Sequence, residues 1–256
     1  MVEARGTALE TEGRVIGVVG ACGGAGASVV AAAVAHGLRR AGERTTLVDL
    51  DAQAPGIEMM LGTEDAAGAR WPDLVAARGE VDGVSLVAAL PRWGVVPVLS
   101  GTREPGPPEG DVVLDVCTGL VRCGETVVLD LPRPGAWGAA TQTSDGSGDG
   151  RAVRALVAGS DVMLLVVPLR LPAAVGAAAA RDALLAAGAA DVRVVVRGPA
   201  PGRVDPDDLS AVLGLPVAAV LGRDGWLASA VERGDGPPMG RRSVLGRFAL
   251  ELAGVL

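Results

Sequence analysis

Short, nearly uninterrupted runs of Val, Leu and Ile recur along the chain, and stretches of helical pattern separate most of them. A run without polar alternation is typical of a strand covered on both faces, as in a parallel sheet flanked by helices. The pattern therefore predicts a doubly wound α/β fold, with a mainly parallel sheet of seven or eight strands and helices on both faces. The expected strands are residues 14–19, 45–50, 95–100, 126–131, 162–167, 192–197 and 217–221.

We expect these elements to form a single domain over residues 14–256, preceded by a flexible lead over residues 1–13. Hydrophobic residues make up 49% of the 256 positions, which is enough for a sizeable core. The lead is polar and acidic and lacks the apolar segment of a signal peptide. The longest Ala-rich stretch, residues 171–190, carries Arg181 and Asp182, which favours a buried helix over a membrane span. We therefore expect a cytoplasmic protein.

The charged residues narrow the range of partners. The formal net charge is −7, acidic and basic residues are interspersed, and no arginine cluster forms a basic stripe. Specific nucleic-acid binding is therefore not expected. All 23 basic residues are arginine, so no lysine can act as a phosphate ligand or general base. Cys22, Cys117 and Cys123 lack metal-ligand spacing, and we interpret them as reduced, small buried side chains.

A glycine-rich segment, "ACGGAGAS" over residues 21–28, follows the first expected strand and precedes a helix that ends at Gly42. Its glycines let the backbone curl, so that its N–H groups and the helix N-terminus point at an anion. The hydroxyl at its end is of a kind that binds Mg²⁺. A tight turn that packs helix on sheet is the alternative interpretation. The candidate cofactor-binding residues are Gly23, Gly24, Ala25, Gly26, Ala27 and Ser28.

Two aspartates follow expected strands and are the candidate catalytic residues. Asp51 comes just after the strand at 45–50, and Asp130 lies at the end of the strand at 126–131. Ligands of such folds bind at the carboxyl ends of the strands. In phosphoryl transfer, one carboxylate commonly serves the metal and another the attacking water. Ser28 and Asp130 are the candidate Mg²⁺ ligands, and Asp49 is interpreted as a residue that caps or braces the segment that carries Asp51.

Three segments together, "ACGGAGAS", "LVDLDAQAPG" and "VVLDLPRPG", resemble the deviant Walker A family of MinD and ParA ATPases. The resemblance implies a P-loop NTPase fold, ATP and Mg²⁺ as cofactors, and a homodimer formed through the loop face. It implies that Asp51 positions the attacking water and that Asp130 serves the metal. The family loop reads Gly-Lys-Gly-Gly-x-Gly-Lys-Thr, and here Cys22 and Ala27 stand in place of its two lysines.

The loop "GGAGAS" and the stretch "WPDLVAARGEVDGVSLVAALP" are similar to the CpaE/TadZ branch, and most of all to its septum site-determining (Ssd) type. This resemblance implies a spatial regulator of septum placement in cell division, or of Tad-type pilus assembly. Septum proteins or Tad-type secretion and pilus proteins would be its partners, and they would recruit it to the pole, septum or inner membrane. Members commonly carry a receiver-like N-terminal domain, and residues 1–13 are too few to form one.

The two missing lysines should weaken ATP binding moderately and ATP hydrolysis more severely. A charged hydrogen bond contributes roughly 1.5–3 kcal/mol, so losing the lysine at Ala27 costs about one to two decades of ATP affinity. Losing one fixed donor to the transition state costs on the order of 10²–10³ in rate, and two are missing. The sequence predicts weak, Mg²⁺-dependent ATP binding with vestigial hydrolysis. The alternative is an active, ATP-dependent dimerisation switch that uses Asp51, Asp130 and an arginine such as Arg133 or Arg170.

The remaining features are interpreted as packing. An iron–sulfur reductase would need cysteines on separate loops, and Cys117 and Cys123 lie close together in one expected helix, so this class is set aside. The four tryptophans are dispersed, and each is expected to pack in the interior. The last helix has apolar residues at helical spacing, which favours the core over direct membrane binding. These apolar residues are Leu245, Phe248, Ala249 and Leu252.

Overall fold

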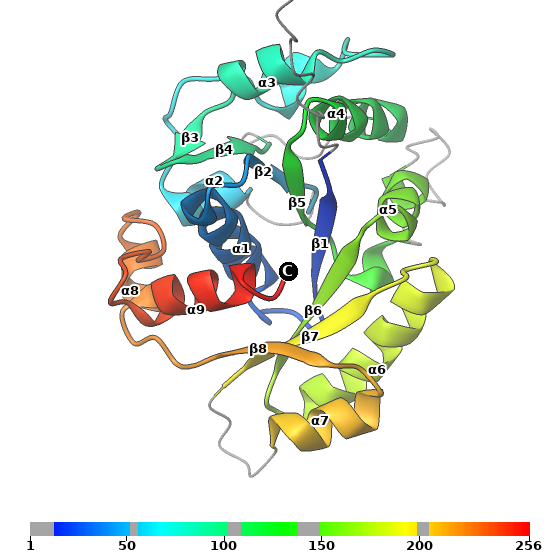
Figure 1. Cartoon of the computed structure of the whole chain (residues 1–256), viewed down its shortest axis with the longest axis vertical. Helices are drawn as coiled ribbons and strands as arrows, with labels where there is room; N and C mark the ends of the chain where they lie inside the picture. Colours follow the sequence, from blue (N-terminus) through cyan, green and yellow to red (C-terminus); the bar gives the residue numbers. More distant parts are fainter. Residues whose placement is uncertain (1–12, 52–55, 102–108, 138–148, 199–204) are drawn as a thin grey trace, which may run out of the picture.

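The computed structural model describes residues 13–51, 56–101, 109–137, 149–198 and 205–256; most of the expected lead lies outside these residues. Within them, eight strands form one sheet in the order β3-β4-β2-β5-β1-β6-β7-β8 (Figure 1). All neighbouring pairs are parallel except β3 with β4. The strands are β1 (Val15–Gly20), β2 (Thr45–Asp49), β3 (Arg92–Trp93), β4 (Val96–Leu99), β5 (Thr126–Asp130), β6 (Val162–Pro168), β7 (Val192–Arg197) and β8 (Val217–Leu221).

Helices cover both faces of the sheet (Figure 1). One hydrophobic cluster joins the sheet to α1, α2, α8 and α9, and the other joins it to α3, α4, α5, α6 and α7. The predicted doubly wound α/β fold is therefore confirmed. The helices are α1 (Ala27–Ala41), α2 (Ile57–Leu61), α3 (Gly83–Ala89), α4 (Gly110–Arg122), α5 (Asp149–Ala158), α6 (Leu171–Ala186), α7 (Pro206–Leu213), α8 (Leu227–Glu232) and α9 (Val244–Ala253), with short 3₁₀ turns η1 (Trp71–Leu74) and η2 (Pro134–Ala136).

Strand β6 shows why the apolar runs form central strands. Met163 and Leu165 pack into one hydrophobic cluster, and Leu164 and Val166 pack into the other. All four side chains are fully buried. Successive side chains of a strand point to opposite faces, so a strand with helices on both sides needs apolar residues at every position.

The structure differs from the sequence-based expectations at a few points. The two-residue strand β3 was not predicted, because a run this short carries no periodic pattern; it pairs antiparallel with β4 across the turn at Gly94. Trp71 and Trp137 are buried as expected, but the packing prediction is wrong for Trp226, whose exposed fraction is 75%. Among the cysteines, Cys117 is buried, whereas Cys22 and Cys123 are only partly buried.

The last helix belongs to the core, as the sequence predicted. In α9, Leu245, Phe248, Ala249 and Leu252 are buried and pack with residues of α1. The two helices approach closely at Gly37, where a Cβ atom would lie 2.1 Å from the carbonyl oxygen of Ala249. Among the described residues, no helix combines the length and the apolar character that a membrane crossing needs.

Candidate functional site

The glycine-rich loop connects β1 to α1, as the sequence predicted, and is a tight turn. Gly24 and Gly26 have φ angles of 69° and 86°, in the left-handed region that favours glycine. The N–H of Ala25 donates to the carbonyl oxygen of Cys22 at 3.2 Å, which closes the turn. A residue with a side chain at Gly24 or Gly26 would be strained.

The start of α1 presents backbone N–H donors beside the loop. Gly26 is the N-cap residue and, as a glycine, has no side chain that could cap the helix, and the first turn has no acidic residue. The first N–H groups of a helix have no partner within the helix and carry partial positive charge. Around the turn there is free space, because a Cβ at Gly24 would meet no atom within 4 Å. This geometry suits an anion.

Asp130 and Ser28 are brought together beside the loop. Asp130, the last residue of β5, is buried. Burial raises the pKa of Asp130 well above its usual value, and the charges of Asp49 and Asp51 raise it further, whereas the neighbouring Ser28 hydroxyl favours the ionised form and so lowers the pKa. Asp51 is therefore within electrostatic reach of Asp130, so the three sequence-predicted polar residues of the site lie in one region.

Asp49 braces the segment that carries Asp51. Its carboxylate accepts hydrogen bonds from the N–H of Asp51 at 3.0 Å and from the N–H of Ile57 at 2.8 Å. Burial raises the pKa of Asp49 to about 6, against the effect of these two hydrogen bonds. The residues between, 52–55, lie outside the described part of the chain. The bracing role expected for Asp49 matches these contacts.

Glu58 is a further carboxylate of the region, and the sequence analysis missed it. It is 3% exposed on α2, and its Oε2 has no hydrogen-bond partner among the described residues. Its charge contributes to the raised pKa of Asp49. In the sequence, Glu58 looks like an ordinary polar residue of a short helix, so no pattern marked it. Within the described residues, no group of three or more acidic, His or Cys side chains forms a metal site by itself.

Arg197 contacts the loop directly and was also missed. It ends β7, and its Nη1 donates to the carbonyl oxygen of Ala25 at 3.0 Å. A Cβ at Gly26 would lie only 2.0 Å from the same nitrogen, so the guanidinium rests against the glycine. Burial lowers the pKa of Arg197, and the neighbouring charge of Arg170 lowers it further. In the sequence, the position of Arg197 at the carboxyl end of a predicted strand was the feature that could have marked it as a site residue.

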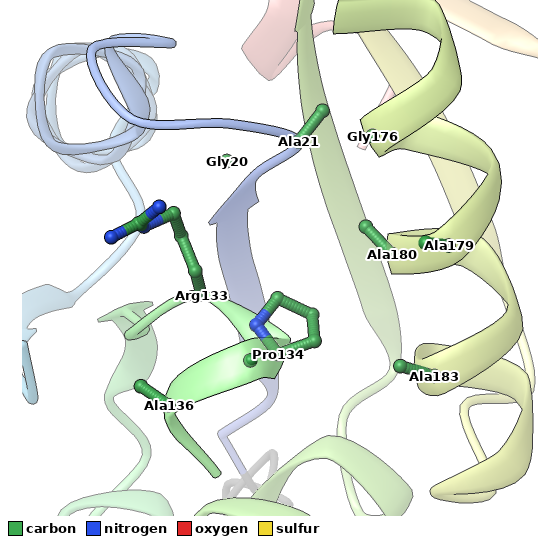
Figure 2. Close-up of a pocket in the computed structure, with 10 residues that line it drawn as sticks. Gly20, Ala21, Arg133, Pro134, Ala136, Gly176, Ala179, Ala180 and Ala183 are labelled. Carbon is green, nitrogen blue, oxygen red and sulfur yellow. The ribbon is translucent and has the colours of Figure 1, made fainter. Parts of the chain in front are cut away.

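A pocket opens between the start of the glycine-rich loop, η2 and α6. Its volume is about 660 Å³, and α6 forms its apolar wall (Figure 2). Arg133 extends away from that wall, and its Nη1 would lie 3.7 Å from a Cβ at Gly23. At Gly176, α6 approaches the carbonyl oxygen of Ala21 so closely that a Cβ there would lie 2.6 Å from it. The lining residues are Gly20, Ala21, Arg133, Pro134, Gly135, Ala136, Gly176, Ala179, Ala180 and Ala183.

Known proteins share both the loop segment and the fold. Residues 12–88 match the ParA family model, described as a NUBPL iron-transfer P-loop NTPase. The crystal structure of a ParA family ATPase from Chlorobium tepidum is 17% identical, with a TM-score of 0.72 over 95% of this chain and 98% of that one. MinD from Aquifex aeolicus is 17% identical, with a TM-score of 0.69 over 94% and 95% of the two chains. Residues 12–88 are thus similar to the ParA family, and the chain has the fold of the ParA and MinD structures.

A further solved structure with the ParA/MinD-like fold carries a nucleotide. The septum site-determining protein MinD from Pyrococcus horikoshii, complexed with Mg-ADP, is 16% identical, with a TM-score of 0.67 over 94% of each chain. Two uncharacterized proteins of Mycobacterium tuberculosis, MT3760 and Rv3660c, are each 38% identical over 249 residues, which is 95% of this chain. The chain spans 64% of the length of these two curated relatives.

Proposed function

We propose that this chain is a degenerate ParA/MinD-like spatial regulator, which binds Mg-ATP weakly and hydrolyses it at a rate near background. One observation carries the proposal. The loop retains its tight turn, its backbone N–H groups and the Ser28–Asp130 pair, while Cys22 and Ala27 stand where the family has lysines. A site of this kind can hold phosphate, but its loop carries neither of the two lysines that would stabilise the charge of the transition state.

The donor set fits a phosphate group bound together with Mg²⁺. The loop offers N–H donors to the phosphate, and Ser28 and Asp130 offer the oxygen ligands that Mg²⁺ prefers. The Oε2 of Glu58 has no hydrogen-bond partner among the described residues. Burial raises the pKa of Asp49, and the charges of Glu58 and Asp51 raise it further. Mg²⁺ would relieve part of this repulsion, because a bound cation is the largest local charge in such a site.

Each residue of the site has a role in this proposal. When bound, Mg-ATP supplies the phosphate charge and the metal ion. Gly23, Gly24, Ala25, Gly26 and Ala27 form the backbone cradle, Ser28 and Asp130 hold the ion, and Asp51 orients water weakly. Asp49 keeps Asp51 in place through its hydrogen bonds to the N–H groups of Asp51 and Ile57.

The proposed biological role is septum-site determination in cell division, or the localisation of Tad-type pilus assembly. It is supported by the similarity of the sequence to the CpaE/TadZ branch and its Ssd type, and by the fold shared with MinD cell division proteins. We propose that residues 14–256 act as one domain and form a homodimer through the loop face. Septum proteins or Tad-type secretion proteins would recruit the dimer to the septum, pole or inner membrane.

An active ATP-dependent dimerisation switch is the second candidate. It is supported by Arg133, whose guanidinium lies beside Gly23 and would be 3.7 Å from a Cβ there. An arginine aimed at the loop can replace a lysine as a donor to developing negative charge. The two candidates differ in whether turnover depends on Asp51.

Localisation in the source organism tests the proposed role. A fluorescent fusion of the complete protein should form foci at the division site or the pole. The Asp51→Ala variant should form the same foci, because the proposed regulator does not need hydrolysis. Foci that are lost specifically in Asp51→Ala would favour the active switch. A uniform distribution of the wild-type fusion would contradict the spatial role.

A further inference from the structure

Two arginines lie at the carboxyl ends of the parallel strands, where the glycine-rich loop also begins. Arg197 ends β7, and Arg170 precedes α6, directly after β6. The register of β6 and β7 pairs Pro168 with Arg197, and the N–H of Leu169 donates to the carbonyl oxygen of Arg197 at 2.9 Å. Because β6 also neighbours β1, the loop after β1 begins at the same end of the sheet.

Neither arginine has a carboxylate partner among the described residues. The contrast with Arg193 of the same strand is clear, because Arg193 pairs with Asp191 at 2.6 Å. Burial lowers the pKa of Arg197, and the like charge of Arg170 lowers it further. The ion pairs of the described residues use Arg14, Arg39, Arg44, Arg78, Arg181, Arg193 and Arg233.

The guanidinium of Arg197 carries more hydrogen-bond donors than its contact with Ala25 uses. It carries five N–H groups, and one of its nitrogens, Nη1, donates to the carbonyl oxygen of Ala25. This contact holds the group against Gly26, where any side chain would collide with it. A guanidinium held beside backbone N–H groups, with a second positive charge nearby, matches the recognition of phosphate oxygens.

We propose that Arg197 is the principal phosphate-binding side chain of this site, assisted by Arg170, and that it supplies from β7 the positive charge that the loop lacks. The ligand class is a polyphosphate, in keeping with the proposed nucleotide site, on which this inference rests. The positive charge of Arg197 comes from strand β7 and not from the glycine-rich loop itself. A chain with no lysine thereby retains a cation at its phosphate site.

Calorimetric titration with inorganic tripolyphosphate and with Mg-ATP, at fixed ionic strength, tests this role. Arg197→Ala should weaken the binding of both ligands at least tenfold, and Arg197→Lys should weaken it less. Arg223→Ala is the matched control, because Arg223 is exposed just after β8 at the same end of the sheet. It should change either affinity by less than twofold.

Two outcomes would overturn the assignment of Arg197. Equal affinity of wild type and Arg197→Ala would do so and would leave the proposed regulator intact. Tighter binding by Arg197→Ala would show that the guanidinium obstructs the site. If wild type binds neither ligand, both this inference and the nucleotide-binding part of the proposed function are wrong.

If a thermal melt without ligand shows that Arg197→Ala does not fold, Arg170→Ala still tests the proposal. Arg170→Ala leaves the contact with Ala25 in place and should weaken tripolyphosphate binding about threefold. An unchanged affinity would contradict the assisting role of Arg170. In a folded Arg197→Ala background, adding Ala27→Lys should restore binding, since it returns one positive charge to the loop. A failure of this rescue would mean that Arg197 acts by shaping the loop and not by its charge.

Discussion

Asp49 and Asp130 are register partners on the adjacent parallel strands β2 and β5, and both carboxyl groups are buried. Burial raises the pKa of both carboxyl groups, because it disfavours their ionised forms. The charge of Asp49 raises the pKa of Asp130 further. The site therefore stores electrostatic repulsion in the absence of a cation. Such a trade of stability for function is common at binding sites.

Replacing Asp130 should stabilise the protein without ligand. Asp130→Asn removes a buried negative charge and retains an oxygen that can accept from Ser28. We expect the melting temperature at pH 7.5 to rise by several degrees, since about 1 kcal/mol corresponds to roughly 2–4 °C in a domain of this size. The exposed Asp208→Asn serves as a control and should not shift it. A lower melting temperature for Asp130→Asn would contradict the burial argument.

The raised pKa of Asp49 predicts a pH dependence of stability. Its pKa is about 6 in the folded state against an ordinary value of 3.8, so the folded state binds the proton more tightly. The contribution of Asp49 to stability therefore rises as pH falls from about 7 to about 4. The stability of Asp49→Asn relative to wild type, measured as the difference in free energy of unfolding, should therefore be greater at pH 7 than at pH 5 by roughly 1 kcal/mol. Urea unfolding at both pH values measures this difference, and a difference of opposite sign would contradict it.

The two left-handed glycines of the loop should differ in their tolerance of alanine. Gly24→Ala adds a methyl group to open space, so only backbone strain of roughly 1 kcal/mol is expected. Gly26→Ala adds the same strain and displaces the flexible end of the Arg197 side chain together with its hydrogen bond to Ala25, so it should be more destabilising by about 1 kcal/mol. Chemical denaturation of both variants gives the comparison. Equal losses would mean that Arg197 does not rest against Gly26.

Restoring a lysine should strengthen nucleotide binding. Ala27→Lys should bind Mg-ATP at least tenfold more tightly, which corresponds to ~1.4 kcal/mol. Cys22→Lys is the matched control, because the family resemblance assigns that lysine to the ATP of the partner subunit. It should give no gain in the monomer. If a well-folded Ala27→Lys variant shows no thermal shift with Mg-ATP, the space beside the loop is too small for the side chain or its ligand.

The sequence predicted the sheet well because its central strands are buried on both faces. The apolar runs located seven of the eight strands of the described residues to within a residue or two at each end, and the exception, β3, has only two residues. The loop, Asp51 and Asp130 were predicted because each follows a strand. Glu58 was not, because no sequence pattern distinguishes it from an ordinary polar residue of a short helix. Arg197 was not, because its importance arises from a contact with a residue far away in the sequence. Arg197 reaches Ala25 across 172 positions, and only the folding of β7 near β1 brings them together.

Titration of the wild-type protein with Mg-ATP, followed by a phosphate-release assay, tests the central claim most directly. We predict Mg²⁺-dependent binding that is about one to two decades weaker than that of a lysine-containing ParA/MinD ATPase measured alongside. Phosphate release should be near background and equal for wild type and Asp51→Ala. Turnover comparable to that of the reference ATPase, abolished by Asp51→Ala, would contradict the account and establish an active switch.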